Sequence, residues 1–209
     1  NGIVRQDRRA DIVIGPPAAG KSSVLANPIS KKYRSRIIDS DTAKAMLPEY
    51  DGGYGAGAVH EESAYITEQL ALDEAVAHGD NVVIPWVGKN PDKIRNKLRE
   101  LKAEGYTVYL HLNELPADKA ARRAVQRFFD TGRFVDPDYV LSVGDKPTEV
   151  YELLKQEGEF DGYTRYSNDV PRGKPATLLE TVYGGRKTAA GEVQTGKHEK
   201  GEARLGGRG

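Results

Sequence analysis

The fold is decided by the stretch Gly15-Pro16-Pro17-Ala18-Ala19-Gly20-Lys21-Ser22, which directly follows the apolar run Ile12-Val13-Ile14. The spacing G-x-x-x-x-G-K-[ST] after a short strand and before a helix predicts a loop that wraps nucleotide phosphates. Glycine at both ends lets successive backbone N–H groups turn inward without Cβ collisions. We therefore expect ATP or GTP as a bound cofactor.

Each part of this loop has its own expected task. Lys21 would reach the β- and γ-phosphates, and the hydroxyl of Ser22 is a hard oxygen ligand for Mg²⁺. Ser23 follows in the same turn, where a helix that begins near Gly20 aims its positive N-terminal end at the anion. The sequence predicts binding of the nucleotide by residues Gly15 to Ser23, with Mg²⁺ at Ser22.

Composition narrows the class of protein. The chain has 209 residues, 38% of them hydrophobic, which suits one α/β domain with a single core. Lysine plus arginine equal aspartate plus glutamate at 31 each, so we expect neither nucleic acid nor a membrane surface as partner. The absence of cysteine excludes disulfides and thiolate chemistry and is compatible with a cytoplasmic location. A start at Asn1 is compatible with a segment of a longer polypeptide.

Short β-branched runs alternate with longer amphipathic stretches, which predicts a three-layer α/β domain of the P-loop NTPase type with a mainly parallel central sheet flanked by helices. We expect this domain to span residues 1–184 and a flexible tail rich in Gly, Lys, Arg and Glu to span 185–209. The expected strands are 11–14, 36–39, 81–86 and 107–112, and the expected helices are 60–78, 90–105, 115–130 and 148–156.

Two carboxylates follow the second expected strand in Ile37-Ile38-Asp39-Ser40-Asp41. If this strand lies beside the phosphate loop, both carboxylates reach the ligand edge of the sheet. There Asp41 can accept the proton of an attacking hydroxyl, whereas Asp39 would support a neighbouring backbone or a Mg²⁺-bound water. The alternative for Asp41 is a helix cap before Thr42.

Arginines cluster in the expected helix that starts at Leu115. Arg127 lies on this helix and Arg133 follows in a loop, so the two guanidinium groups can meet one phosphate and stabilise the charge of a transferring phosphoryl group. For Arg122 and Arg123 we expect a solvated helix face instead.

The stretch 50–63 is rich in glycine and tyrosine and ends in His60-Glu61-Glu62-Ser63. It suits a substrate-binding lid in which Glu61, Glu62 and Ser63 bond hydroxyl groups. The same residues also suit a simple helix cap. His60 is not expected to bind metal, because the four histidines lack ligand spacing.

Taken together, the phosphate loop, Ile38-Asp39-Ser40-Asp41-Thr42 with Lys44, the stretch 47–50, residues 59–63 and the arginine pair resemble the zeta toxin family over residues 11 to about 180. The resemblance implies a P-loop kinase that transfers the γ-phosphate of ATP to the 3′-hydroxyl of UDP-N-acetylglucosamine. It implies Lys21 as the phosphate lysine, Ser22 at the Mg²⁺ position, Asp41 as the base, and Arg127 and Arg133 as the γ-phosphate arginines. It further implies substrate contacts by Asp41, Lys44, Glu61, Glu62, Ser63, Glu68 and Lys89.

The chain departs from the family at one place. After the strand Val82-Val83-Ile84 the family usually carries a Glu-Gly-Thr-like segment, whereas this chain has Pro85-Trp86-Val87-Gly88-Lys89. Acidic and hydroxyl contacts to the acceptor are lost there, and Trp86 is expected to pack in the core. The sequence therefore does not decide which molecule accepts the phosphate.

The leading hypothesis is a kinase of UDP-N-acetylglucosamine or a related nucleotide sugar. One alternative keeps the kinase and changes the acceptor to another nucleotide, a dinucleotide or an antibiotic. Another is a nucleotide-binding switch or ATPase module, which the missing acidic strand end after Ile84 disfavours. Because the family often pairs with a helical antitoxin, the resemblance also implies an inhibitory protein partner.

Overall fold

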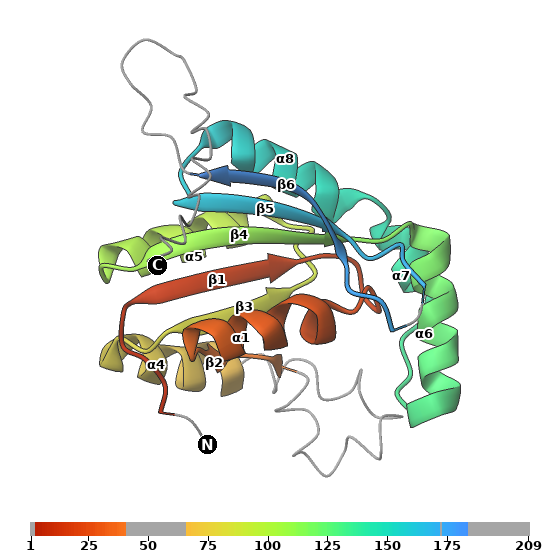
Figure 1. The fold of residues 1–209 in the computed structure, drawn as a ribbon, viewed down its shortest axis with the longest axis horizontal. Coiled ribbons are helices and arrows are strands. Elements are labelled where there is room, and N and C mark those ends of the chain that lie inside the picture. Colours follow the sequence, from red (N-terminus) through yellow and green to blue (C-terminus); the bar gives the residue numbers. More distant parts are fainter. Residues whose placement is uncertain (1–2, 41–65, 172, 184–209) are drawn as a thin grey trace, which may run out of the picture.

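The computed structural model describes residues 3–40, 66–171 and 173–183, and these form an open sheet with helices packed around it (Figure 1). The predicted tail 185–209 and the predicted lid 50–63 lie outside the described residues. Every helix in the described part of the chain is too short or too polar to span a bilayer.

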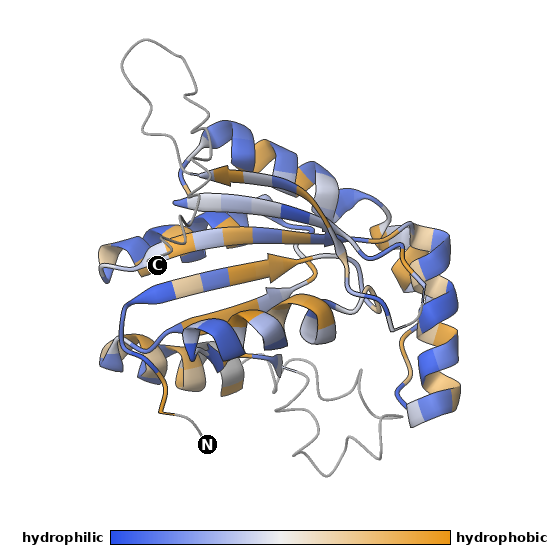
Figure 2. Ribbon diagram, viewed as in Figure 1, coloured by the Kyte–Doolittle hydropathy of each residue, from blue (hydrophilic) through white to orange (hydrophobic). Residues whose placement is uncertain are grey.

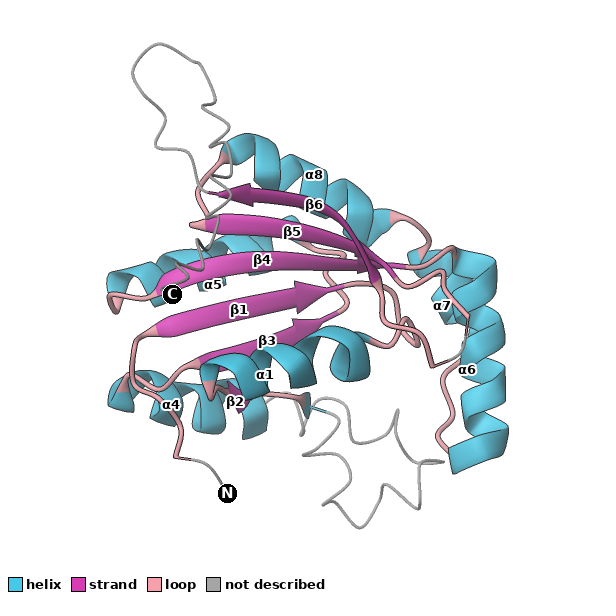
Figure 3. Ribbon diagram, in the orientation of Figure 1, coloured by secondary structure: helices cyan, strands magenta, loops and turns pink. Residues whose placement is uncertain are grey.

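The centre of the molecule is a six-stranded sheet in the order β2-β3-β1-β4-β5-β6 (Figure 3). All neighbouring strands are parallel except β6, which runs antiparallel to β5. The inner strands β1, β3 and β4 coincide with runs that the sequence pattern indicates, and both faces of β1 and of most of β3 are buried. The strands are β1 (Arg9–Ile14), β2 (Arg36–Ile37), β3 (Val82–Trp86), β4 (Thr107–Glu114), β5 (Gly162–Ser167) and β6 (Thr177–Tyr183).

Helices cover both faces of this sheet, which confirms the predicted three-layer α/β fold. On one face the π-helical turn η1 (Ser22–Ala26) packs Leu25 against Val13 and Val83, and α1 (Asn27–Tyr33) continues it. On the other face lie α4 (Leu72–His78), α5 (Pro91–Ala103) and α8 (Lys146–Glu157), which share the main core. Orange segments in Figure 2 mark apolar residues of β1 and β4.

At the carboxyl ends of the strands stands a helical hairpin made of α6 (Ala117–Thr131) and α7 (Pro137–Val143) (Figure 1). A small core of Ala120, Ala124 and Val140 holds it against the buried Ala19 of the phosphate loop. The alanines permit a close approach, so the hairpin is positioned directly beside that loop.

Two helices begin or end at the capping residues that the sequence predicts. Asn90 caps α5, because its side-chain oxygen accepts the N–H groups of Asp92 and Lys93 at 3.0 and 3.2 Å. Gly79 ends α4 in the left-handed conformation with φ 74°. The described part of the predicted helix 60–78 begins with a π-helical turn, η3 (Ile66–Ala71).

Other expectations need correction. The strand that precedes Asp39 is separated from β1 by β3, which pairs with both, although Asp39 still lines the same cleft as the phosphate loop. That strand, β2, also has only two residues instead of the four expected. The helix α7 and the strands β5 and β6 were not predicted, since their short segments mix polar and apolar residues.

Candidate functional site

A cleft of about 1800 Å³ opens at the carboxyl ends of the strands. Its walls include the phosphate loop, the segment that follows β2, the end of β3 with the start of α5, the α6–α7 hairpin, and the residues that follow β5. This is the edge at which parallel α/β sheets bind ligands. The sequence-predicted loop therefore faces a cavity large enough for a nucleotide and a second small molecule.

The phosphate loop has the shape that its motif predicts. Gly20 has φ +83°, and a Cβ at Gly15 would lie 2.3 Å from the carbonyl oxygen of Asn113, so neither position accepts a side chain without strain. Pro17, Ala18, Gly20, Lys21, Ser22 and Ser23 line the cleft, whereas Gly15, Pro16 and Ala19 are buried beneath it. All nine predicted residues thus belong to one turn, six of them at the cavity.

Lys21 folds over this turn. Its ammonium nitrogen donates to the carbonyl oxygens of Gly15 and Pro16, both at 2.9 Å. Ser22 beside it is exposed and lines the cleft, and Ser23 donates from its hydroxyl to Gly20 O at 3.1 Å. A hard oxygen and a lysine therefore lie next to each other at the rim of the loop.

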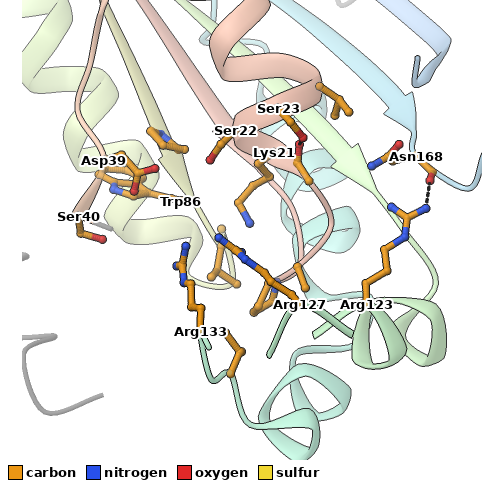
Figure 4. A pocket seen from close by; sticks show the side chains of 18 of the residues that line it. Lys21, Ser22, Ser23, Asp39, Ser40, Trp86, Arg123, Arg127, Arg133 and Asn168 are labelled. Atoms are coloured by element: carbon orange, nitrogen blue, oxygen red, sulfur yellow. Dashed lines mark hydrogen bonds between the residues drawn. The ribbon is translucent and has the colours of Figure 1, made fainter. Parts of the chain in front are cut away.

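The predicted arginine pair lies in the same cleft. Arg127 projects from α6 and Arg133 from the segment after it, and both line the cavity half-buried. In Figure 4 their guanidinium groups and the Lys21 ammonium point toward one another. Three cations gathered on one cavity are suited to a polyanion such as a triphosphate.

The prediction that Arg123 lies on a solvated helix face is wrong. Its Nη2 donates to the backbone oxygens of Asn168 at 2.9 Å and Val170 at 3.4 Å, and the residue lines the cleft (Figure 4). Arg122, the preceding residue, is exposed as expected. Arg123 instead ties α6 to the chain that follows β5.

The opposite wall holds polar and aromatic groups. Asp39 and Ser40, which follow β2, line the cleft with Trp86 at the end of β3 (Figure 4). Trp86 packs partly against the core, as expected, but it also faces the cavity. Lys93 Nζ lies 4.5 Å from the centre of its ring.

Of the predicted substrate-binding residues, only Lys89 has a described side chain. It is exposed, lines the cleft, and places its Nζ 5.1 Å from the ring centre of Tyr139. Glu68 lies in η3, but the description does not extend to its side chain. The remaining predicted residues, Asp41, Lys44, Glu61, Glu62 and Ser63, lie outside the described residues.

Sequence reasoning missed Asn113 and Asn168, which are buried behind the phosphate loop. Their side-chain amides donate to the carbonyl oxygen of Ala19 at 2.8 and 2.7 Å. A usable signal existed for Asn113, which directly follows the expected strand 107–112 at the edge where ligands bind, but not for Asn168, because β5 was not predicted. Their shared target depends on strand order, which the sequence does not display.

No curated protein sequence matches this chain. Its fold resembles that of a solved structure from the PezAT chromosomal toxin-antitoxin system of Streptococcus pneumoniae, with a TM-score of 0.65 at 16% identity over 85% of this chain and 72% of that chain. It also resembles the complex AvrRxo1-ORF1:-ORF2 with ATP, at a TM-score of 0.64, 17% identity and 90% of this chain. The chain spans 60% of the length of the AvrRxo1 chain that it matches.

A gluconokinase from Sinorhizobium meliloti 1021 has the same general fold, with a TM-score of 0.51 at 21% identity over 80% of this chain and 86% of that chain. The family model described as "Zeta toxin" matches residues 4–173, which is more than half of the chain and includes the phosphate loop, the arginines and both asparagines. The match to this family model supports the conclusion that the chain binds a nucleotide and has a kinase-type function. The chain belongs to the zeta toxin family.

Proposed function

We propose that this chain is an ATP-dependent small-molecule kinase that transfers the γ-phosphate to an alcohol, most specifically to a sugar hydroxyl of UDP-N-acetylglucosamine or a related nucleotide sugar. The observation that supports it is the meeting of three elements on one cleft: Lys21 of the phosphate loop, the arginines Arg127 and Arg133, and the segment that follows β2. A phosphoryl-transfer site needs positioning and charge stabilisation above all, and these elements supply both.

In this proposal the loop N–H groups and Lys21 hold the β- and γ-phosphates. Arg127 and Arg133 contact the γ-phosphate oxygens, whose negative charge grows in the transition state. Asp41, which directly follows the cleft residue Ser40, orients the acceptor hydroxyl and takes its proton. The bond between the γ-phosphorus and the bridging oxygen breaks as the new phosphorus–oxygen bond forms, and ADP leaves.

Mg²⁺ fits the residues present. Mg²⁺ bound to a nucleotide takes few protein ligands and keeps several waters. The exposed hydroxyl of Ser22 beside Lys21 is a suitable single oxygen, and Asp39 lines the same cleft and would hold a water of the ion. When bound, the ion neutralises phosphate charge during transfer.

The acceptor is proposed on the family resemblance, with another nucleotide, a dinucleotide or an antibiotic as the alternative. The wall of the cleft at Pro85, Trp86 and Val87 is less polar than a wall built for sugar hydroxyls. Trp86 and the cations Lys89 and Lys93 suit an acceptor with an aromatic face and phosphates, which both a nucleotide sugar and a dinucleotide possess. An inhibitory antitoxin is proposed as a protein partner, in line with the toxin-antitoxin system named for the Streptococcus pneumoniae structure.

The test is mass spectrometry of a mixture of nucleotide sugars, dinucleotides and hydroxylated antibiotics incubated with the chain, ATP and Mg²⁺. We expect one component to gain the mass of one phosphate, and Asp41→Asn to slow this gain by about 10² to 10⁴-fold. A control with Ser40→Ala, which changes the neighbouring hydroxyl and keeps the carboxylate, should retain most of the rate. Acceptor-independent ATP hydrolysis stimulated by a protein would instead indicate a switch or ATPase module.

A further inference from the structure

Two buried asparagines from different strands bind one carbonyl group of the phosphate loop. Nδ2 of Asn113, in β4, lies 2.8 Å from the oxygen of Ala19, and Nδ2 of Asn168, just after β5, lies 2.7 Å from it. Asn113 is fully buried and Asn168 is 5% exposed. Because a carbonyl oxygen only accepts, both side chains must present N–H groups to it.

The sheet brings the two asparagines together. Asn113 pairs with Tyr166 in the parallel register of β4 and β5, and the backbone N–H of Asn168 donates to Glu114 O at 2.9 Å. The ladder therefore continues one step beyond β5. Asn113 lies in β4 and Asn168 directly follows β5, whereas the carbonyl that both bind belongs to a loop.

This arrangement fixes the orientation of one peptide group. In a trans peptide the C=O and the next N–H point in opposite directions. Ala19 O points into the sheet, toward the asparagines, so the N–H of Gly20 points the other way. Gly20 lines the cleft, while Ala19 is fully buried. The Gly20 N–H is therefore directed to the side on which the phosphates would lie.

The phosphate loop contains a strained residue, and the two asparagine hydrogen bonds to Ala19 O, here called the clamp, can hold the loop in that conformation. Ala18 has φ +60°, a left-handed conformation that costs a residue with a Cβ about 1 kcal/mol or more. In addition, Oδ1 of Asn113 is buried with no hydrogen-bond partner among the described residues. A buried oxygen without a partner lowers the free energy of unfolding. Asn113 therefore has a task besides stabilising the fold, and its contact with Ala19 O indicates that this task is to hold the loop.

We propose that Asn113 and Asn168 are positioning residues for nucleotide binding: by holding Ala19 O they turn the Gly20 N–H toward the triphosphate. The inference rests on the proposed function, because it takes the loop as the triphosphate site. Without the clamp the peptide can flip, which removes a phosphate donor and turns a carbonyl oxygen toward the anion.

Three variants of the whole chain test this inference. Asn168→Ala removes one of the two N–H donors and leaves Asn113 in place, while Asn168→Asp sets a carboxylate against the carbonyl. We expect Kd for MgATP to rise about tenfold in the first and about 10²-fold in the second, from the loss of one hydrogen bond and from added repulsion. The control for a loss of buried hydrogen bonds away from the cleft is Asn81→Ala: Asn81 is fully buried, donates to Tyr33 O and to the Asp7 carboxylate, and accepts from the N–H groups of Asp7 and Arg9.

The amide signal of Gly20 in a ¹⁵N–¹H NMR spectrum is a readout that a merely structural role would not move. We expect it to shift downfield when MgATP or inorganic tripolyphosphate binds the natural chain and Asn81→Ala, and to shift less in both Asn168 variants. Equal phosphate affinity and an equal Gly20 shift in all variants would overturn the clamp and leave the kinase proposal standing. Failure of the natural chain to bind either phosphate compound would overturn both.

Discussion

Nη2 of Arg123 lies 2.9 Å from the backbone oxygen of Asn168, so the residue that holds the phosphate loop from behind is itself held by helix α6. The same helix carries Arg127 into the cleft. The hairpin and the loop are therefore joined through Asn168 as well as through the small core at Ala19.

Arg123→Gln should weaken MgATP binding by about tenfold, because charge-assisted hydrogen bonds to the Asn168 and Val170 carbonyls contribute about 1.5 to 3 kcal/mol and hold α6 beside the loop. Arg122→Gln is the matched control, since it removes the same charge from the neighbouring exposed position. Isothermal titration measures both. An equal loss of MgATP affinity in the two variants would indicate that the charge of the helix matters and that the hydrogen bonds of Arg123 to Asn168 and Val170 do not.

Gly20→Ala should abolish nucleotide binding. The new Cβ would lie 2.8 Å from Nδ2 of Asn168, at a position whose φ of +83° already disfavours a side chain. Gly158→Ala is the control, because its φ of +67° is also positive but no atom lies within 4 Å of the added Cβ. Both variants should lose roughly 1 kcal/mol of stability from backbone strain alone. Only Gly20→Ala should lose ATP affinity, as equilibrium titration would show.

The acid stability of the domain should depend on Asp11. This fully buried carboxylate accepts two hydrogen bonds from Arg9, at 2.8 and 2.6 Å, and lies 2.8 Å from Nε2 of His111. Burial opposes its ionisation, but the hydrogen bonds from His111 and Arg9 outweigh burial and lower the pKa of Asp11 below the ordinary 3.8.

Because the folded pKa is lowered, the stability that Asp11 contributes is complete above pH 3.8 and is lost as the pH falls through the folded pKa. Asp11→Asn should reduce the free energy of unfolding at pH 7 by about 3 to 5 kcal/mol, since it leaves the Arg9 charge unpaired between the rings of Tyr33 and Tyr109. Urea denaturation from pH 2.5 to 7 measures this effect. An unchanged dependence on acid in the variant would contradict it.

Trp86 provides an optical probe of the acceptor site, because it is the one tryptophan of the chain and lines the cleft. Emission from Trp86 should fall when an acceptor with an aromatic base binds, through stacking on the ring. Trp86→Phe should raise KM for the acceptor by severalfold and leave the ATP affinity within about twofold, because a smaller ring offers less stacking area. A change in ATP affinity instead would place the ring at the nucleotide.

The sequence predicts those parts of the fold that local patterns determine. The phosphate loop is a contiguous motif, and the buried strands β1, β3 and β4 are runs of apolar residues, so both were predictable. β5 and β6 mix polar and apolar residues without strict alternation, and α7 has only seven residues, so none of these gave a clear periodic signal.

The residues of the candidate site also fall into two groups, those that the sequence predicts and those that depend on long-range contacts. Lys21, Ser22, Arg127, Arg133 and Lys89 were predicted and line one cleft. Asn113, Asn168 and the role of Arg123 escaped prediction because their contacts join residues between 45 and 149 positions apart. Such contacts depend on the order of β1, β4 and β5 in the sheet, which the sequence does not display.

The most direct test of the whole account is isothermal titration of MgATP into the natural chain and into Lys21→Met. Lys21 donates to the loop carbonyls of Gly15 and Pro16 and is the loop's own cation, so its removal should raise Kd by about 10²-fold, as loss of a charge-assisted phosphate contact requires. We predict one site per natural chain and strongly weakened binding in the variant. No binding by the natural chain, or equal Kd values in the two proteins, would contradict the account.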